Sequence, residues 1–233
     1  MCQTCSRRLF IGGAAASLVM AGVPGASAAA ILRGCSFSQA DQEPDELKSS
    51  SGDAALDEAL IIELQRILTV IPKINPGFQY LVDKEPNAYA TVKTYVSGTN
   101  GTVLIGVNLV KMLMQQPEGG AAVAGMCAHE CGHIYQFSTD FYQRLKEVLL
   151  IELHADFLSG VYMGKRAEFT ADRVWQLSKA LHEHGGYAYT DPSYHGTPGQ
   201  RSAAMEKGYR LASSKKSFDE LAIIGESYVR NLA

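Results

Sequence analysis

The chain has no excess of basic residues, few cysteines and no internal repeat. Its 233 residues include 21 Lys and Arg against 24 Asp and Glu, so it lacks the basic surface that a nucleic-acid binder needs. Five cysteines, an odd number, do not form a complete disulfide framework. Because 46% of the residues are hydrophobic and no long biased tract occurs, disordered and collagen-like proteins are excluded. The composition predicts one globular domain with appendages.

The first thirty residues have the order of an export signal. Arg7 and Arg8 precede an apolar run over residues 9–23, and small residues follow at 26–28. The paired arginines resemble a twin-arginine signal, which directs proteins that are exported already folded. The run is shorter than the roughly 20 apolar residues of a membrane-spanning helix. We therefore expect residues 1–30 to direct export to the periplasm or cell surface. A retained membrane anchor and a disordered N-terminus are the alternatives.

Cys35 provides a second interpretation of this region. The segment Leu32–Cys35 resembles a bacterial lipoprotein cleavage site, although Arg33 stands where a small residue is usual. A lipid on Cys35 would anchor the protein to a membrane and make the following polar stretch a tether. Without the lipid, residues 31–53 are a disordered linker, because Ser, Asp, Glu, Gln and Lys dominate them. In both cases the folded domain is expected over residues 54–233.

The pattern of apolar residues predicts an α+β domain that is mostly helical. Helical spacing covers residues 53–70, and Pro72 stops it. From 78 to 107, β-branched and aromatic residues alternate with turn signals, which predicts a small antiparallel sheet of about three strands. Further helices are expected over residues 118–137, 141–166, 170–184, 197–212 and 217–232. The sheet therefore lies N-terminal to most of the helices.

His129, Glu130 and His133 form an HExxH motif in the first of these later helices. At about 100° per residue, His133 lies about 400° from His129, so both imidazoles leave the same helix face. Two imidazoles can share one zinc ion, and Glu130 beside them can act on a water molecule there. Chance alone produces this spacing in roughly one chain in a hundred of such composition. A zinc site therefore needs further evidence.

Glu152 and Asp156 supply that evidence from the next helix. They lie one helical turn apart within the apolar run 148–161, where buried carboxylates are costly unless a cation compensates them. We expect Glu152 to be the third ligand of one zinc ion per chain. Asp156 is expected to accept a hydrogen bond from the outer nitrogen of His129 and so to orient that ring. The alternative is an ordinary amphipathic helix with two solvated acids.

Separated segments of the chain resemble one group of enzymes. Residues 129–133, 152–161 and 195–201 are similar to the neutral zinc metallopeptidases of bacteria, and more broadly to gluzincins, in which a downstream Glu is the third ligand. Residues 87–90 and 101–106 resemble the strands beside the active site of that group. The resemblance implies a zincin-like fold. It also implies that His195 stabilises an oxyanion and that Arg201 holds the active-site carboxylates, whereas a loop His and a surface Arg are the alternative.

Other residues are given no part in the metal site. The metzincin pattern fails, because it needs Gly at 136 and His at 139, where Gln136 and Thr139 stand. His154 lies about 200° around the helix from Glu152 and is predicted to face away from the metal. Cys127 and Cys131 depart from the family pattern, as does His154. We predict that both cysteines are small buried hydrophobic residues, with redox control as the alternative.

The predicted function is that of an exported zinc metalloendopeptidase. A bound zinc ion lowers the pKa of water to about 7, and Glu130 removes the proton as the water attacks a peptide carbonyl. The substrate would be a peptide or an unfolded protein that pairs with an edge strand at residues 102–106. Two alternatives remain open: a non-catalytic zinc-binding chaperone or interaction module of the same fold, and a zinc amidase that acts on cell-wall peptide.

Overall fold

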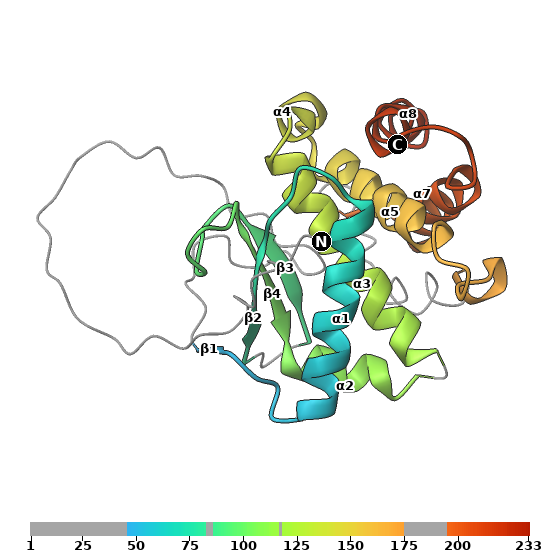
Figure 1. Ribbon diagram of the computed structural model, residues 1–233. Coiled ribbons are helices and arrows are strands. Elements are labelled where there is room, and N and C mark those ends of the chain that lie inside the picture. Colours follow the sequence, from blue (N-terminus) through green and yellow to red (C-terminus); the bar gives the residue numbers. More distant parts are fainter. Residues whose placement is uncertain (1–45, 83–85, 117, 175–194) are drawn as a thin grey trace, which may run out of the picture.

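The computed structural model describes residues 46–82, 86–116, 118–174 and 195–233 (Figure 1). The predicted export signal at 1–30 and Cys35 lie outside the described residues, and so does most of the helix expected at 170–184. Within the described ranges, no helix has both the length and the apolar character needed to cross a membrane.

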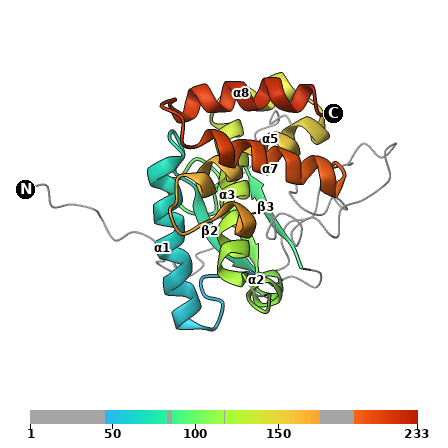
Figure 2. The same ribbon diagram turned by 90° about the vertical axis from the view of Figure 1, so that its right-hand side faces the viewer.

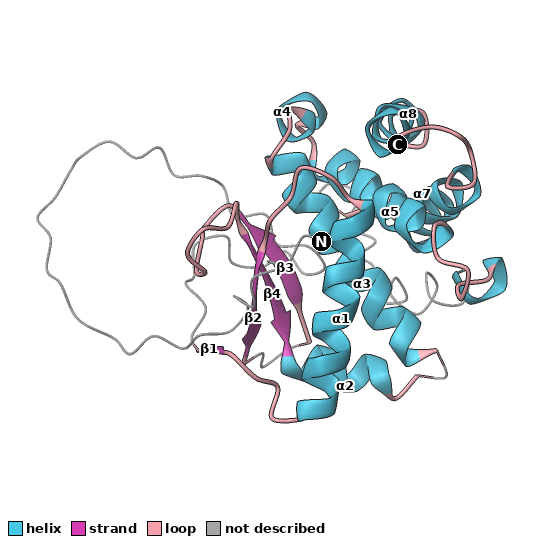
Figure 3. Ribbon diagram, viewed as in Figure 1, coloured by secondary structure: helices cyan, strands magenta, loops and turns pink. Residues whose placement is uncertain are grey.

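The described chain is mostly helical and has a small sheet near its start, which confirms the expected α+β class (Figure 3). In Figure 1 the sheet lies on one side of α1 and α3, and α5, α7 and α8 lie on the other side. The elements, in chain order, are β1 (Leu47–Lys48), α1 (Ala54–Val70), β2 (Gly77–Leu81), β3 (Ala88–Thr91), β4 (Thr102–Gly106), α2 (Val107–Met114), α3 (Gly119–Phe137), α4 (Phe141–Leu145), α5 (Val148–Gly164), α7 (Pro198–Leu211) and α8 (Phe218–Arg230).

The sheet is mixed, not antiparallel as the sequence led us to expect. Its described strands are ordered β1-β2-β4-β3, and β2 runs parallel to β4 while the other pairs are antiparallel. The strand at residues 102–106 therefore has neighbours on both sides, and the prediction that a substrate pairs with it is wrong. All of its residues are buried, and a continuous apolar run of this kind is typical of a central strand. Among the described strands, β3 is the edge next to β4.

Three further boundaries differ from the expected ones. The segment 141–166 forms two helices, because Lys146 has a φ of 63°, a left-handed conformation that a continuous helix does not allow. Helix α2 follows β4 directly and was not predicted. Strand β1 lies inside the stretch 31–53 that was expected to be a disordered linker, because it pairs with β2.

Several helix starts are fixed by side chains. Thr197 and Gln200 form a capping box at the start of α7, where Pro198 occupies the first turn. Ser217 and Glu220 form a second capping box at the start of α8. Each box satisfies backbone amides that the first helical turn leaves free. In Figure 2, α7 and α8 run along the same side of the molecule.

Helices α5 and α7 pack at backbone contact. A Cβ atom added to Gly160 of α5 would lie 1.9 Å from the Met205 carbonyl oxygen, and one added to Gly208 of α7 would lie 2.0 Å from the Phe157 carbonyl oxygen. Only glycine allows this approach. The close packing brings the first turns of α7 alongside the first half of α5, where the predicted acidic ligand lies.

Candidate metal centre

His129 and His133 of α3 meet Glu152 of α5 in one buried cluster. Helices α3 and α5 pack side by side, and the three side chains are at most 3% exposed. Their candidate ligand atoms all lie within 4.8 Å of one another. The structure thus brings together the residues that the sequence predicted as ligands, in an arrangement that can hold a metal ion.

The separations between the ligand atoms are close to those around a metal ion. The two Nε2 atoms of His129 and His133 are 3.0 Å apart. Glu152 Oε2 lies 3.3 Å from His129 Nε2, and Glu152 Oε1 lies 3.4 Å from His133 Nε2. Zinc bonds to nitrogen and oxygen of about 2.0–2.2 Å, arranged tetrahedrally, place neighbouring ligand atoms about 3.3–3.6 Å apart. The cluster needs little adjustment to bind such an ion.

The outer nitrogens of both histidines face oxygen atoms. His129 Nδ1 lies 2.9 Å from Asp156 Oδ1, as predicted, and His133 Nδ1 lies 2.9 Å from Gln136 Oε1. An oxygen in that position favours a hydrogen on Nδ1 and leaves the lone pair of a neutral ring on Nε2. Two lone pairs that face each other at 3.0 Å repel unless a cation or a proton lies between them. The donor set therefore fits a metal cation.

Arg201 holds the carboxylates, as the resemblance implied. Its Nε donates to Asp156 Oδ2 at 2.7 Å and its Nη2 donates to Asp156 Oδ1 at 3.0 Å. The same Nη2 also lies 3.3 Å from Glu152 Oε2. This two-pronged geometry is the strongest form of arginine–carboxylate pair. His195 lies at the same cluster, with its Nδ1 3.4 Å from Glu152 Oε2.

Glu130 is fully buried beside the two histidines. Among the described residues, neither of its carboxylate oxygens has a hydrogen-bond partner. Burial raises the pKa of Glu130 above its ordinary value. A buried carboxylate without a partner is costly for the fold, and such perturbed groups cluster at functional sites.

Two members of the cluster have opposite pKa shifts. Burial alone would raise the pKa of Glu152, but its interactions with the neighbouring rings of His133, His195 and His129 hold it well below its usual range. Burial alone would lower the pKa of His129, but Asp156 and Glu152 raise it well above its usual value. Glu152 is thus an anion, and a carboxylate must be ionised to bind a metal cation.

His154 is not a ligand, as predicted, but it is not at the surface either. It is completely buried and its Nδ1 lies 3.0 Å from Gln136 Nε2. Burial lowers the pKa of His154 to about 4, so the ring is neutral at pH 7. The contact of Gln136 with His133 was not predicted. Gln136 stands three residues after His133, a spacing that places both on one helix face and could have indicated the contact.

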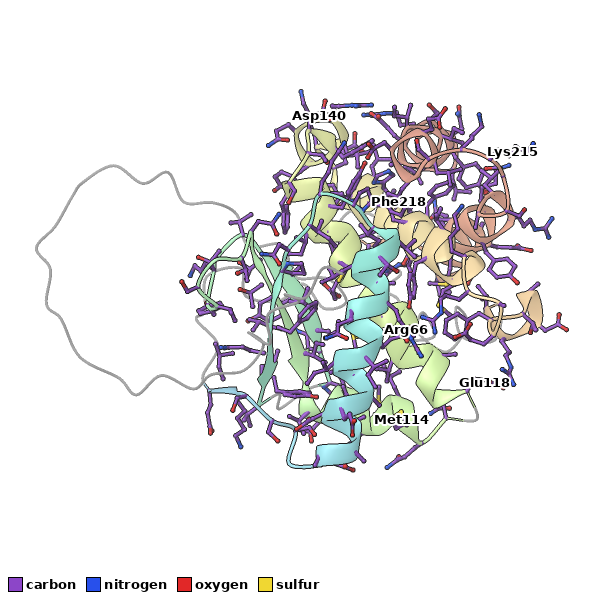
Figure 4. All side chains as sticks on the ribbon, viewed as in Figure 1. Arg66, Met114, Glu118, Asp140, Lys215 and Phe218 are labelled. Carbon is purple, nitrogen blue, oxygen red and sulfur yellow. The ribbon has the colours of Figure 1, made fainter. Side chains whose placement is uncertain are left out.

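Cys127 and Cys131 are free and fully buried in the core, which confirms the prediction for both. Burial raises the pKa of each thiol, so neither forms the reactive thiolate at pH 7. By contrast, charged side chains such as Asp140 and Lys215 lie at the periphery of the molecule (Figure 4). Among the described residues, the buried carboxylates and guanidinium groups other than Glu226 lie at the candidate metal centre.

No protein-family model matches the chain, and comparison with curated proteins and with solved structures found no match either. The chemistry of the site is therefore argued from its geometry alone. That geometry consists of a buried His-His-Glu donor set, a carboxylate beside it, and oxygen atoms that face the outer nitrogens of both rings.

Proposed function

We propose that the chain is a zinc-dependent peptidase whose metal ion is held by His129, His133 and Glu152. Two imidazole nitrogens and one carboxylate oxygen form a donor set that suits zinc. Structural zinc sites are closed by four protein ligands, whereas catalytic sites use three and keep one position open. The described residues supply three, which favours a catalytic site.

The charges buried at the site support a divalent cation. The site holds three buried carboxylates, those of Glu130, Glu152 and Asp156, and one buried guanidinium, that of Arg201. When both imidazoles are neutral, as metal ligation requires, two negative charges are left without compensation inside the protein. Uncompensated buried charge is strongly unfavourable, and a cation of charge +2 would neutralise it.

Glu130 is the observation that carries the proposal. The buried Glu130 carboxylate makes no hydrogen bond among the described residues. A metal site with a purely structural role does not need such a group. A peptidase needs one, because a general base must take a proton from the attacking water and return it to the leaving amine. Burial raises the pKa of Glu130 toward neutral pH, and a general base is most effective when its pKa lies near the working pH.

The remaining side chains have supporting roles in this mechanism. When bound, a zinc ion supplies Lewis-acid chemistry and lowers the pKa of water. Asp156 orients His129, and Arg201 holds Asp156 and Glu152 in place while it offsets part of their charge. His195, next to Glu152, donates a hydrogen bond to the oxyanion that develops on the substrate. Residues 1–30 direct export in this proposal.

Replacement of the proposed base tests the function directly. Glu130→Gln should bind zinc stoichiometrically and cleave an unfolded protein about 10²–10⁴-fold more slowly, as measured by metal analysis and fragment formation with and without a chelator. Glu58→Gln is the matched control, because Glu58 is an exposed residue of α1. Equal activity in Glu130→Gln would refute the base assignment.

The same assay separates the alternative functions. Metal-dependent binding of unfolded protein without fragments would favour the chaperone alternative, and cleavage of peptidoglycan alone would favour the amidase.

A further inference from the structure

A chain of hydrogen bonds runs from His133 away from the metal centre to helix α8. Gln136 Oε1 lies 2.9 Å from His133 Nδ1. The Gln136 amide nitrogen lies 2.9 Å from the Ile151 carbonyl oxygen and 3.0 Å from His154 Nδ1. His154 Nε2 lies 2.9 Å from the carbonyl oxygen of Ala222 in α8. Each of these side chains is completely buried, so water does not compete for these groups.

The backbone carbonyl groups of Ile151 and Ala222 fix which atom donates and which accepts in each of these hydrogen bonds. A carbonyl oxygen only accepts, so the NH₂ group of Gln136 must face Ile151 and His154 must carry its hydrogen on Nε2. Neutral His154 then accepts at Nδ1 from the second hydrogen of Gln136. The amide oxygen of Gln136 is left facing His133, and it too can only accept. His133 must therefore carry its hydrogen on Nδ1.

We propose that Gln136 and His154 are positioning residues that hold His133 in its metal-binding tautomer, and that the docking of α8 fixes this arrangement through the Ala222 carbonyl. The inference rests on the proposed metal site and deepens it, because it makes zinc affinity depend on a helix that supplies no ligand. Partners of this kind, which orient a metal-ligating histidine, contribute about 10–100-fold to metal affinity.

Two features of the surroundings support a positioning role. An amide at position 136 orients His133 without adding a fourth buried carboxylate to a site that already has three. Helix α8 is fixed close to these hydrogen bonds, because the Phe218 ring packs edge-on against Tyr135 at 5.2 Å and the Tyr135 hydroxyl donates to Asp219 at 2.6 Å. The carbonyl acceptor is thus held in place by contacts that do not involve the metal centre.

Four variants separate positioning from simple loss of packing. Gln136→Met keeps the side-chain length and removes both polar functions. His154→Phe keeps a ring stacked on Phe141, whose centroid is 4.8 Å away, but removes the donor and the acceptor. His154→Gln restores one of each. Ser159→Ala is the matched control, since it deletes a buried hydrogen bond of 2.8 Å from α5 to the Gly125 carbonyl, away from the site.

The experiment has two readouts: the tautomer of His133 in the metal-free chain, measured by ¹⁵N NMR, and the zinc dissociation constant, measured by competition with a chelator. We expect the Nδ1–H tautomer in the wild type, Ser159→Ala and His154→Gln. Gln136→Met should lose this tautomer and bind zinc about 10–100-fold more weakly. His154→Phe should show the same change to a smaller extent.

Wild-type affinity and tautomer in Gln136→Met would overturn the proposal, and so would a His154→Gln variant as impaired as His154→Phe. Thermal unfolding of each variant detects a loss of fold. If Gln136→Met does not fold, the comparison of His154→Gln with His154→Phe decides the question. If zinc affinity changes among the variants as expected but the wild type cleaves no protein, the peptidase function is refuted and the positioning role is supported.

Discussion

The two histidines of the candidate metal centre are oriented by partners of different charge. His129 faces the carboxylate of Asp156, which is itself paired with Arg201, whereas His133 faces a neutral amide. The sequence allowed the first partner to be predicted, because Asp156 lies one turn from Glu152 on an apolar helix. It did not allow the second. The role of Gln136 depends on which of its amide atoms faces His133, and a carbonyl of another helix decides that.

Arg201 is expected to stabilise the fold mainly when no metal is bound. In Arg201→Met, the carboxylates of Asp156 and Glu152 stay buried without their cation, so the metal-free chain should lose about 3–5 kcal/mol of unfolding free energy. Zinc should reduce that loss, because it offsets part of the same charge. Urea unfolding with and without zinc measures both values.

The control for this prediction lies on the same helix. Arg210 has a side chain that is 72% exposed and pairs with Glu206 one turn away, so Arg210→Met should change the unfolding free energy by less than about 0.5 kcal/mol. Equal losses in the two variants would contradict the prediction. They would mean that burial of the Arg201 pair has no energetic consequence.

Asp219 gives the fold a pH-dependent contact that is independent of the metal. Hydrogen bonds from Lys73 and Tyr135 lower the pKa of its carboxyl. Because the folded-state pKa is depressed, this stabilisation is present above the unfolded-state pKa of about 3.9 and is lost as pH falls through the folded-state value.

Asp219→Asn should therefore cost about 1 kcal/mol at pH 7, a value that allows for solvent screening of the exposed Lys73 partner. At pH 2 the variant and the wild type should differ little. Unfolding curves at both pH values provide the measurement. A difference that is the same at both would mean that the charge of Asp219 contributes nothing.

At the scale of the elements, the contact between α5 and α7 sets the geometry of the site. Gly160→Ala would force a Cβ atom against the Met205 carbonyl oxygen, 1.9 Å away, and should destabilise the fold by about 1–3 kcal/mol or more. Separation of the helices would also move Arg201 away from the carboxylates. We therefore expect weaker zinc binding along with the lower unfolding free energy.

Gly120→Ala is the matched control, because an added Cβ there meets no atom within 4 Å. In an exposed position of a helix, alanine is favoured over glycine by up to about 1 kcal/mol. Gly120→Ala should therefore be neutral or slightly stabilising, with unchanged zinc affinity. If both alanine variants behave alike, close backbone packing is not what holds α7 in place.

The elements also show where prediction from sequence ended. Apolar spacing located α1, α7 and α8, because each of these helices buries one face. Helix α3 was also located, although it is buried on all sides. The break between α4 and α5 carried no such signal, since it depends on the left-handed backbone of Lys146. The order of the strands was not predictable either, because apolar residues mark a strand but do not name its neighbours.

For the molecule as a whole, metal binding should appear as stability. If zinc binds the folded chain alone, a free zinc concentration 1,000 times the dissociation constant adds about 4.1 kcal/mol to the unfolding free energy. Calorimetry with zinc and with a chelator measures the shift in melting temperature. The variant Glu152→Gln should show a much smaller shift, because it loses the anionic ligand.

A surface control completes this test. Glu206→Gln changes an exposed carboxylate of α7 and should keep the full response to zinc. The same response in Glu152→Gln would show that the ion binds elsewhere.

The candidate metal centre draws on segments that are far apart along the chain. Its imidazoles are at 129 and 133, its carboxylates at 130, 152 and 156, and its guanidinium at 201. The carbonyl group that accepts the hydrogen bond from His154 is at 222. During synthesis on the ribosome, the histidines emerge long before the groups that orient them. A nascent chain that stops short of α8 would leave His133 free to change tautomer, so efficient acquisition of the ion should await completion of the C-terminal helix.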